Sequence, residues 1–437
     1  HEVSVIVESG TQASHYQSTG QSKQLFTGIA FEASLALLGS VEVGALPDMV
    51  AFTPDGSALL VANEGEAPAD PADDALRDFA NDVPGTVSLV DLRNGVAAAT
   101  VTNLDFSAFN VGGSRASEVP ADLRREPGAS SLANDLEPEY IVVNEAGTKA
   151  YVSLQEANAI AVIDIPARRV DSLIALGRKD HGRIENALDA SDRDGISIQA
   201  EAGIVGLHMP DGLAVYRSGG VDYVLTANEG DSRDDVDECG IDDFSNLDAI
   251  FAGREGNEEL GRLDLVCNQG RDTNGDGLLD QLAAFGARSF SVVGPQGIVY
   301  DSGDDFERVL AHLDQIDGRT VFNASNTNNT RENRSDNKGP EPEAVVVASI
   351  DGVPYAFIGL ERDGGIMVYD LRNPRLPRFV DYVNNRDFSQ DPEDGTPGDL
   401  GPEGLVFIPA ALSPNGENLL VVGNEISGST TIYRVDL

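Results

Sequence analysis

A short unit recurs along this chain of 437 residues and constrains its fold more than any other feature. Each copy opens with a proline and a carboxylate, continues into a strand of apolar and β-branched residues, and turns back at a glycine. A second apolar strand then ends on another carboxylate, and a third strand follows. The five copies begin at Pro47, Pro138, Pro210, Pro342 and Pro402.

Apolar strands joined by Asp-Gly, Asn-Gly or Gly-Gly turns are expected to pair antiparallel. Four-stranded antiparallel units repeated in sequence are typical of a β-propeller, in which radial repetition protects the strand edges. An array of separate small sandwiches is the alternative, but units this short cannot bury their own cores. We therefore predict an all-β protein, a single β-propeller domain over residues 1–437, with residues 230–288 inserted within one blade.

The first residues resemble the middle of a blade rather than its beginning. HEVSVIVESG (1–10) matches the second strand of the repeat, which places Glu8 at the position of Glu64. GIAF (28–31) and SLALLGSVEV (34–43) match the strands that finish such a blade. We expect a chain that begins inside a blade, with six blades represented here, the first incomplete, and seven in the intact protein.

The charge of the chain excludes several classes of partner. The formal net charge is −43, from 73 acidic and 30 basic residues. Nucleic acid and anionic membranes are therefore poor partners, because like charges repel. No apolar run approaches the length of about 18 residues that a transmembrane helix needs. A surface this acidic suits a salty medium or multivalent cations.

The repeat predicts two rings of carboxylates at one mouth of the propeller channel. The first strand of a blade lines the channel and the second returns antiparallel, so the start of one and the end of the other emerge on the same face. The inner ring comprises Asp48, Glu139, Asp211, Glu343 and Glu403, and the second ring comprises Glu64, Glu156, Glu229, Glu361 and Glu425. Two of the prolines are also preceded by a glutamate, Glu137 and Glu341.

Carboxylates at this density repel one another unless something neutralises them. Hard cations such as Ca²⁺, Mn²⁺ or Mg²⁺ take oxygen ligands, so the rings are candidate metal ligands. Basic residues beside the same motifs offer the alternative of structural salt bridges between blades: Arg233, Arg334, Lys338 and Arg362. The doubled charge of Glu-Pro-Glu at 137–139 and 341–343 favours a metal.

The segment RDTNGDGLLDQL (271–282) has the spacing of a calcium-binding loop. Its candidate ligands at positions 1, 3, 5, 7 and 9 are Asp272, Asn274, Asp276, the Leu278 carbonyl and Asp280. Position 12, where a bidentate glutamate is usual, holds Ala283. We therefore predict a structural Ca²⁺ site that stabilises the insertion, rather than a calcium sensor.

Three further residues carry candidate chemistry. Cys239 and Cys267 are the only cysteines, and both lie in the predicted insertion. They form either a disulfide or two free thiols. His181 lies in a polar loop beside Asp180, where it is a candidate metal ligand or general acid/base, with simple solvation as the alternative.

Several motifs together resemble the choice-of-anchor I family. They include LPDMVAFTPDG (46–56), DLEPEYI (135–141), TANEGDSRD (226–234), RSDNKGPEPE (334–343) and FIGLERDGGIMVYD (357–370). The family consists of bacterial extracellular proteins that are similar to an animal mesenchyme-specific cell surface glycoprotein. The resemblance implies a seven-bladed propeller in an extracellular or periplasmic location, secreted or anchored to the surface.

Two functions of different class follow. The first is a metal-dependent hydrolysis of a phosphoester in a small phosphorylated molecule, by fold-level analogy with propeller phytases and phosphotriesterases. In it Arg334, Lys338 and Arg362 would neutralise phosphoryl oxygens, while His181 or a ring carboxylate would move the proton. The second is a non-catalytic surface module, stabilised by calcium, that binds a glycan or protein of the extracellular matrix.

Overall fold

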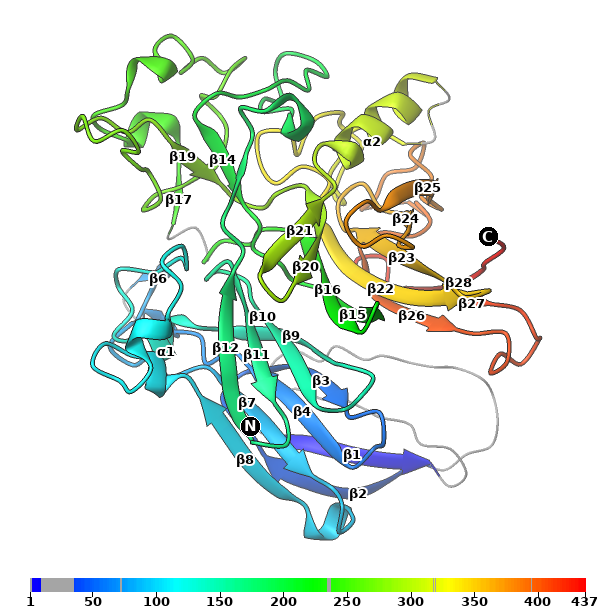
Figure 1. Cartoon of the computed structure of the whole chain (residues 1–437). Helices are drawn as coiled ribbons and strands as arrows, with labels where there is room; N and C mark the ends of the chain where they lie inside the picture. Colours follow the sequence, from blue (N-terminus) through cyan, green and yellow to red (C-terminus); the bar gives the residue numbers. More distant parts are fainter. Residues whose placement is uncertain are drawn as a thin grey trace. The chain divides into compact units, whose positions relative to one another are not determined.

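The computed structural model describes residues 2–8, 35–70, 73–233, 237–316, 318, 320–393 and 395–437. The chain divides into two compact units, unit 1 (residues 1–175) and unit 2 (residues 176–437), each with its own sheets (Figure 1). The expected strand at 28–31 lies outside the described residues. Within the described part of the chain, no helix is long and apolar enough to cross a membrane.

Unit 1 contains two four-stranded antiparallel sheets. The first is β3-β4-β7-β8, with strands Pro47–Phe52, Ala58–Asn63, Thr86–Asp91 and Thr100–Asp105. The second is β9-β10-β11-β12, with strands Pro138–Val143, Lys149–Leu154, Ala159–Asp164 and Arg169–Ala175. Two further strand pairs and a short helix complete it: β1-β2 (Glu2–Glu8, Leu35–Glu42), β5-β6 (Ala69–Asp70, Asp73–Arg77) and α1 (Leu132–Asp135).

Three antiparallel sheets of unit 2 contain copies of the repeat, two of them with four strands and one with three. They are β15-β16-β20-β21 (Leu213–Ser218, Val221–Asn228, Ser289–Gly294, Gly297–Asp301), β22-β23-β24-β25 (Pro342–Ile350, Val353–Leu360, Ile366–Asp370, Arg378–Val383) and β26-β27-β28 (Pro402–Ile408, Leu419–Asn424, Ser429–Arg434). A helix, α2 (Asp305–Ile316), follows β21. Short 3₁₀ helices occur in both units. They are η1 to η3 in unit 1 (Val96–Ala98, Ser107–Phe109, Ala116–Glu118) and η4 to η6 in unit 2 (Ile184–Asn186, Ile241–Asp243, Ala249–Phe251).

These sheets confirm the prediction of an all-β protein made of antiparallel propeller blades. In every one of them the strand order follows the chain order. Neighbouring sheets meet through their first strands, β3 with β9 in unit 1, and β22 with β15 and β26 in unit 2. The Pro210 copy has its third strand at β20, as its sequence predicts. The number of blades and the closure of a ring stay predictions.

Tight turns set the register of two hairpins in unit 2. Asp351 and Gly352 have φ of 51° and 81°, and they join the paired residues Ile350 and Val353. Positive φ at both central residues matches the right-handed twist of antiparallel strands, which is why Asp-Gly is favoured there. Gly219 and Gly220 form the equivalent turn between β15 and β16.

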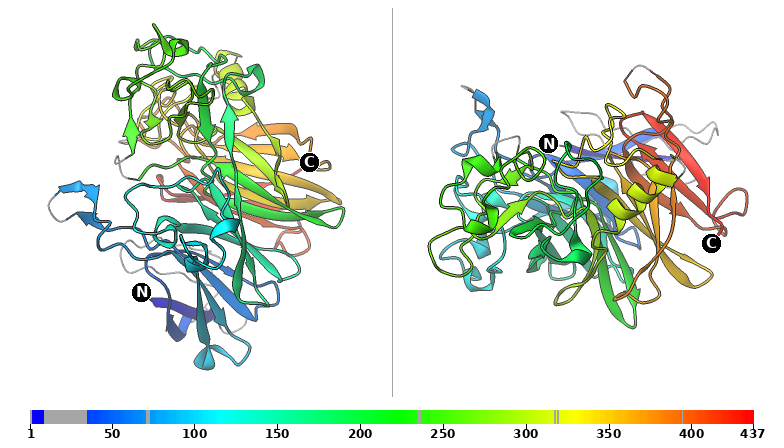
Figure 2. Two further views of the ribbon diagram at one scale, coloured as in Figure 1. Left: turned by 60° about the vertical axis from the view of Figure 1, so that its left-hand side comes forward. Right: turned by 90° about the horizontal axis from the view of Figure 1, so that it is seen from above.

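Aromatic side chains fill the core of unit 2 between α2 and the sheets. The ring of Phe306 on α2 lies 6.1 Å from that of Tyr369 on β24, and Phe290 on β20 lies 4.7 Å from Tyr369. All three are fully buried. Phe306 therefore packs α2 against this part of unit 2. Figure 2 shows the helix, in yellow, beside the strands of this unit.

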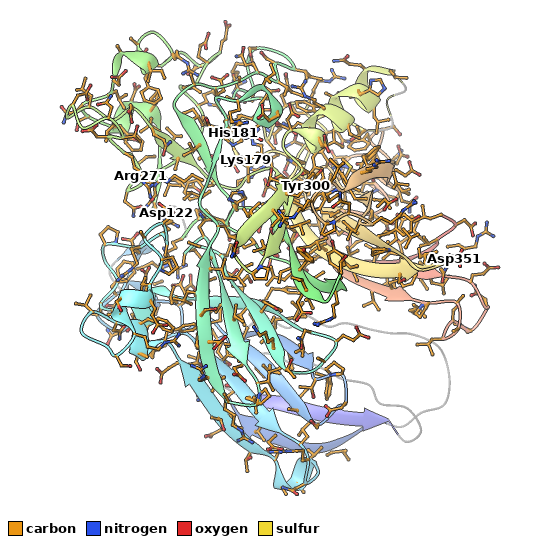
Figure 3. The ribbon with its side chains drawn as sticks, viewed as in Figure 1. Asp122, Lys179, His181, Arg271, Tyr300 and Asp351 are labelled. Atoms are coloured by element: carbon orange, nitrogen blue, oxygen red, sulfur yellow. A yellow bond between two sulfur atoms is a disulfide. The ribbon has the colours of Figure 1, made fainter. Side chains whose placement is uncertain are left out.

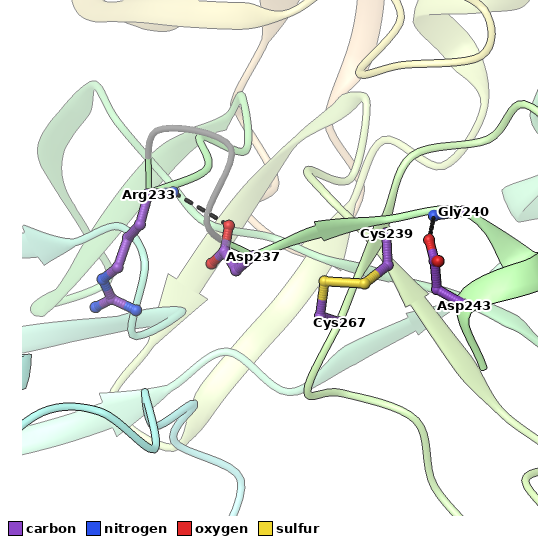
Figure 4. The surroundings of a disulfide bond; sticks show 6 residues. All are labelled: Arg233, Asp237, Cys239, Gly240, Asp243 and Cys267. Atoms are coloured by element: carbon purple, nitrogen blue, oxygen red, sulfur yellow. Dashed lines mark hydrogen bonds between the residues drawn. A yellow bond between two sulfur atoms is a disulfide. The ribbon is translucent and has the colours of Figure 1, made fainter. Parts of the chain in front are cut away.

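The segment between β16 and β20 builds a sheet that the sequence does not reveal. Its strands are β17 (Glu238–Cys239), β18 (Leu265–Val266) and β19 (Leu282–Ala284). They join β13 (Arg178–Asp180) and β14 (Ile204–Leu207) in the order β13-β14-β19-β18-β17, with β14 and β19 parallel. A disulfide links Cys239 to Cys267 (Figure 4). In the same segment the Arg233 N–H donates to the Asp237 carboxylate and the Gly240 N–H donates to the Asp243 carboxylate.

Candidate functional site

A β-bulge positions the first carboxylate in four copies of the repeat. Pro342 of β22 pairs with Leu360 of β23, and the next pair is Val345 with Ile358. Strand β22 therefore advances three residues where β23 advances two, which is a β-bulge. Bulges redirect side chains and are frequent beside active sites. The same irregularity follows Pro47, Pro138 and Pro402, so equivalent bulges position Asp48, Glu139, Glu343 and Glu403.

A backbone hydrogen bond joins the residue before the proline of a copy to the second carboxylate residue of that copy. Glu341 precedes its proline with φ of 51°, and its carbonyl accepts the N–H of Glu361 at 2.8 Å. A left-handed conformation is uncommon for residues other than glycine and concentrates at functional sites. The same bond links Leu46 to Glu64 at 2.9 Å and Gly401 to Glu425 at 2.7 Å, again with positive φ before the proline.

Buried asparagines fix the ends of three second strands, a feature that the sequence analysis missed. The Asn228 amide donates to the hydroxyls of Ser289 (3.1 Å) and Ser291 (2.8 Å), and both hydroxyls donate to Asp301. Because Glu229 follows Asn228 directly in the chain, this hydrogen-bond network fixes the backbone position from which the Glu229 side chain extends. Asn63 with Thr86 and Ser88, and Asn424 with Ser429 and Thr431, repeat the arrangement. In the sequence, the Asn-Glu pair that ends the second strand and the two hydroxyl residues at alternate positions of the third strand were the signal for this network.

Carboxylates from three separate segments converge in unit 2. Ligand oxygens of Glu229, Glu341 and Glu361 lie within 4.8 Å of one another. Glu229 follows β16, Glu341 precedes β22 and Glu361 follows β23. Electrostatic interactions with Glu343 extend the group, so we define the carboxylate cluster as Asp211, Glu229, Glu341, Glu343, Glu361 and Glu403.

Three basic side chains neutralise the innermost member of the cluster. Glu341 is fully buried and is paired with Arg334 at 2.6 Å, Arg362 at 3.0 Å and Lys338 at 3.3 Å. Burial alone raises the pKa of this carboxyl, but the charges of Lys338, Arg334 and Arg362 outweigh it and hold the pKa at about 2. Glu341 is therefore ionised and belongs to a four-residue ion-pair group.

The glutamate two residues further on has the opposite surroundings. Among the described residues, the buried Oε2 atom of Glu343 has no hydrogen-bond partner. Burial raises the pKa of Glu343 well above its usual range, and the charges of Glu361, Asp211, Glu229 and Glu403 raise it further. Burial, with Glu341 and Glu229, also raises the pKa of Glu361 to about 8. These two carboxyls are the under-neutralised part of the cluster.

The chemistry of the cluster fits a hard divalent cation. Its six carboxylates outnumber the three basic residues that pair with Glu341. Two of these basic residues also pair with Glu229 (2.8 Å, Lys338) and Glu361 (3.3 Å, Arg362). The converging oxygens of Glu229, Glu341 and Glu361, and the unpartnered buried oxygen of Glu343, are the kind of donor that Ca²⁺, Mn²⁺ or Mg²⁺ accepts. A bound cation would also remove the repulsion that raises these pKa values.

The remaining predicted ring residues are distributed over both units. Asp48, Glu64, Glu137, Glu139 and Glu156 lie in unit 1, and Glu425 follows β27 in unit 2. Glu137 and Glu156 are buried there. Convergence is therefore established within unit 2 alone, and two complete rings stay a prediction.

His181 lies in a different buried network from the cluster. Its Nδ1 atom is 2.6 Å from the Asn186 carbonyl, and Lys179 beside it on β13 pairs with Asp301 at 3.0 Å (Figure 3). Burial, with the charge of Lys179, lowers the pKa of His181 well below its usual range. His181 is only 2 % exposed, so the alternative of a simply solvated histidine is wrong, and a catalytic or metal-binding role for it stays a prediction.

The predicted calcium loop is exposed and shaped by its own side chains. The Asp272 carboxylate accepts backbone N–H groups from Gly275 at 2.6 Å and Gly277 at 2.8 Å. Asp280 is bonded to Thr273. The three aspartates of the loop do not bring their oxygens within 4.8 Å of one another, and calcium binding here stays a prediction.

The comparisons with known proteins establish the family. The model of the choice-of-anchor I domain matches residues 1–374. The chain belongs to the choice-of-anchor I family. Within the curated proteins, this family member is 28 % identical over 185 residues to Gigasin-3a of Magallana gigas, covering 40 % of the chain and 64 % of that protein. It is 24 % identical over 348 residues to a mesenchyme-specific cell surface glycoprotein of Strongylocentrotus purpuratus, covering 66 % of the chain and 42 % of that protein.

The choice-of-anchor I chain thus spans less than two thirds of the length of each of these two relatives. Among solved structures, it is similar to a periplasmic gluconolactonase of Pseudomonas aeruginosa, with a TM-score of 0.38 and 12 % identity over 92 % of this chain and 70 % of that one. It is also similar to a putative 6-phosphogluconolactonase of Bacteroides uniformis, with a TM-score of 0.36 and 11 % identity over 100 % of this chain and 92 % of that one.

Proposed function

We propose that this chain is a secreted, divalent-cation-dependent phosphoester hydrolase whose site is the carboxylate cluster of unit 2. The observation that carries the proposal is Glu343, a bulge-positioned carboxyl with a buried, unpartnered oxygen surrounded by four other acidic groups. A buried carboxyl in such surroundings is costly to keep unless it binds something, and strongly perturbed pKa values concentrate at functional sites.

Glu343, Glu361 and Glu229 are the residues that would hold the cation. Glu341 is less suited to direct ligation because both of its oxygens already pair with basic groups. A divalent cation bound there would polarise a phosphoryl oxygen and neutralise charge as the ester bond breaks. Ca²⁺, Mn²⁺ and Mg²⁺ all meet the ligand chemistry.

The basic residues and a carboxylate that is not a cation ligand supply the other requirements of hydrolysis. Arg362 and Lys338 pair with Glu341 of the cluster and would bind the remaining phosphoryl oxygens. Arg334 also pairs with Glu341 and would support them. A water oxygen bonds to phosphorus as the bond from phosphorus to the leaving alcohol oxygen breaks. The attacking water gives up one proton and the leaving alcohol oxygen takes one up. A carboxylate of the cluster that is not a cation ligand, such as Asp211 or Glu403, would carry that proton.

A panel of phosphomonoesters and phosphodiesters, assayed with and without Ca²⁺, Mn²⁺ and Mg²⁺, tests this function. We expect turnover that requires a divalent cation and disappears on chelation. The Arg217→Lys variant, altered at an exposed residue of the β15-β16 hairpin, is the control and should retain full activity. Absence of turnover with every substrate and cation would contradict the proposal.

We also propose that the loop at 272–280 binds a structural Ca²⁺ that stabilises the segment between β16 and β20. A ligand at 100 times its dissociation constant stabilises the folded state by about 2.7 kcal/mol. Calcium should therefore raise the melting temperature, and Asp272→Asn combined with Asp276→Asn should remove most of that increase. Glu255→Gln, an exposed change in the same segment, should not. An equal calcium effect in all three proteins would contradict the site.

A non-catalytic role in binding an extracellular matrix component is the second candidate. It is favoured by the similarity to a protein described as a cell surface glycoprotein. The two functions differ in a simple respect, because a binding module would need its cations for stability but would release no phosphate. Binding to a glycan array, together with an inactive phosphoester panel, would favour this alternative.

A further inference from the structure

A buried arginine holds the loop that carries two of the three basic residues of the site. Arg288 is 4 % exposed, and its guanidinium donates to the carbonyls of Ser335 at 2.7 Å and Asn337 at 2.6 Å. These two carbonyls lie between Arg334 and Lys338 in the chain. The guanidinium therefore fixes the loop backbone at the point from which both basic side chains extend.

The other side of Arg288 is anchored in the core of unit 2. It donates to the Asp189 carbonyl at 2.7 Å and pairs with the Glu307 carboxylate of α2 at 2.7 Å. Glu307 is 1 % exposed and also accepts from the Asn323 amide at 2.9 Å. Arg288 thus connects α2 and the backbone at Asp189 to the loop, and its two terminal nitrogens together donate to four acceptors.

The loop is shaped to receive this side chain. Gly339 has φ of 69°, and a Cβ atom there would lie 2.9 Å from Cδ of Arg288. The N–H groups of Gly339 and Asn337 both donate to the Arg334 carbonyl, at 2.9 Å and 3.1 Å. The loop therefore winds back on itself around the guanidinium, and any residue other than glycine at 339 would press on it.

A second buried arginine serves a neighbouring loop in the same way and gives an internal comparison. Arg386 is 6 % exposed and donates to the carbonyls of Arg362 at 2.7 Å and Ser325 at 2.6 Å. It also donates to the Asn329 side chain at 2.8 Å. Its contacts are with 325–329 and Arg362, whereas those of Arg288 are with 335–339.

We infer that Arg288 is a positioning residue, whose guanidinium orders residues 335–339 and so directs Arg334 and Lys338 onto Glu341. A guanidinium can serve several acceptors in one plane, whereas an ammonium is a point charge on a flexible stem and cannot replace it at such a site. The kinetic consequence rests on the proposed function, but the ordering of the loop does not.

Amide hydrogen exchange followed by mass spectrometry tests the ordering directly. In Arg288→Lys we expect exchange at Ser335, Asn337 and Gly339 to be faster by about tenfold or more, with β22 and β23 unchanged. Arg386→Lys should instead loosen 325–329, and Arg217→Lys should loosen neither. Uniform loosening of the whole unit in Arg288→Lys, or no change at 335–339, overturns the inference.

Gly339→Ala provides a second variant that disturbs the same contact from the loop side, in case Arg288→Lys does not fold. It should reproduce the local loosening at 335–339. In the phosphoester assay both variants should lower kcat by about 10-fold to 100-fold, as changes to supporting residues do, while Mn²⁺ binding measured by calorimetry changes less. Unaltered kcat in a variant with a loosened loop overturns the positioning role. If the native protein lacks turnover, the proposed function fails, and the exchange result alone decides the inference.

Discussion

Replacing Glu341 with glutamine is expected to lower the free energy of unfolding by about 3–5 kcal/mol, the cost of removing one partner of a buried ion pair. Glu341 is the shared partner of Arg334, Lys338 and Arg362 and is itself fully buried. Glutamine would leave these three positive charges close together without their common anion. Chemical denaturation of the cation-free protein, followed by circular dichroism, measures the change.

Two comparisons separate the lost ion pairs from a general effect of the substitution. Glu417→Gln, at an exposed turn before β27, should leave stability within about 0.5 kcal/mol of the native value. A double-mutant cycle with Arg362→Gln should show strong coupling, because that guanidinium lies 3.0 Å from the Glu341 carboxylate. Additive effects of the two substitutions would show that the ion-pair group does not act as one.

The fold follows from sequence because its signals are local and repeated. Strand, turn and carboxylate recur in the same order in five copies, and each blade is an antiparallel sheet of consecutive strands. Even the third strand of the Pro210 copy is found at β20, although a long segment separates it from β16. The sheet that this segment forms with β13 and β14 depends on pairing between strands far apart in the chain, including a parallel pair. No local sequence pattern predicts such pairing.

The candidate site follows from sequence only in part. The repeat predicted Glu229, Glu341 and Glu361 at one channel mouth, and their oxygens converge in unit 2. The basic residues near them were recognised as possible partners. Sequence treats Glu341 and Glu343 alike, as two carboxylates on either side of one proline. Their surroundings differ because Arg334, Lys338 and Arg362 converge on the first alone.

The backbone conformation and the supporting residues lie beyond sequence reasoning of this kind. Leu46 and Glu341 adopt positive φ although neither is glycine, because the proline and the hydrogen bond to the second carboxylate residue fix them. Arg288 is not a candidate site residue in the sequence analysis, and its importance comes from four acceptors contributed by segments far apart in the chain. Tertiary packing, rather than local preference, decides such features.

The same substitution two residues away should give the opposite result. We expect Glu343→Gln to leave the stability of the cation-free protein within about 1 kcal/mol of the native value, because burial and the neighbouring carboxylates raise the pKa of Glu343 and so favour its uncharged form. The variant should instead lose divalent-cation binding and cation-dependent turnover by about 10-fold to 100-fold or more. Calorimetric titration with Mn²⁺ and the phosphoester assay measure the two losses.

Glu145→Gln, in the exposed turn between β9 and β10, is the control for this substitution and should bind cations as the native protein does. Loss of stability with cation binding intact would mean that Glu343 has a structural role and is not a ligand. The pair of variants is more informative than either alone. A web of structural salt bridges requires both glutamates for stability, whereas a cation site supported by an ion-pair group requires Glu341 for stability and Glu343 for binding.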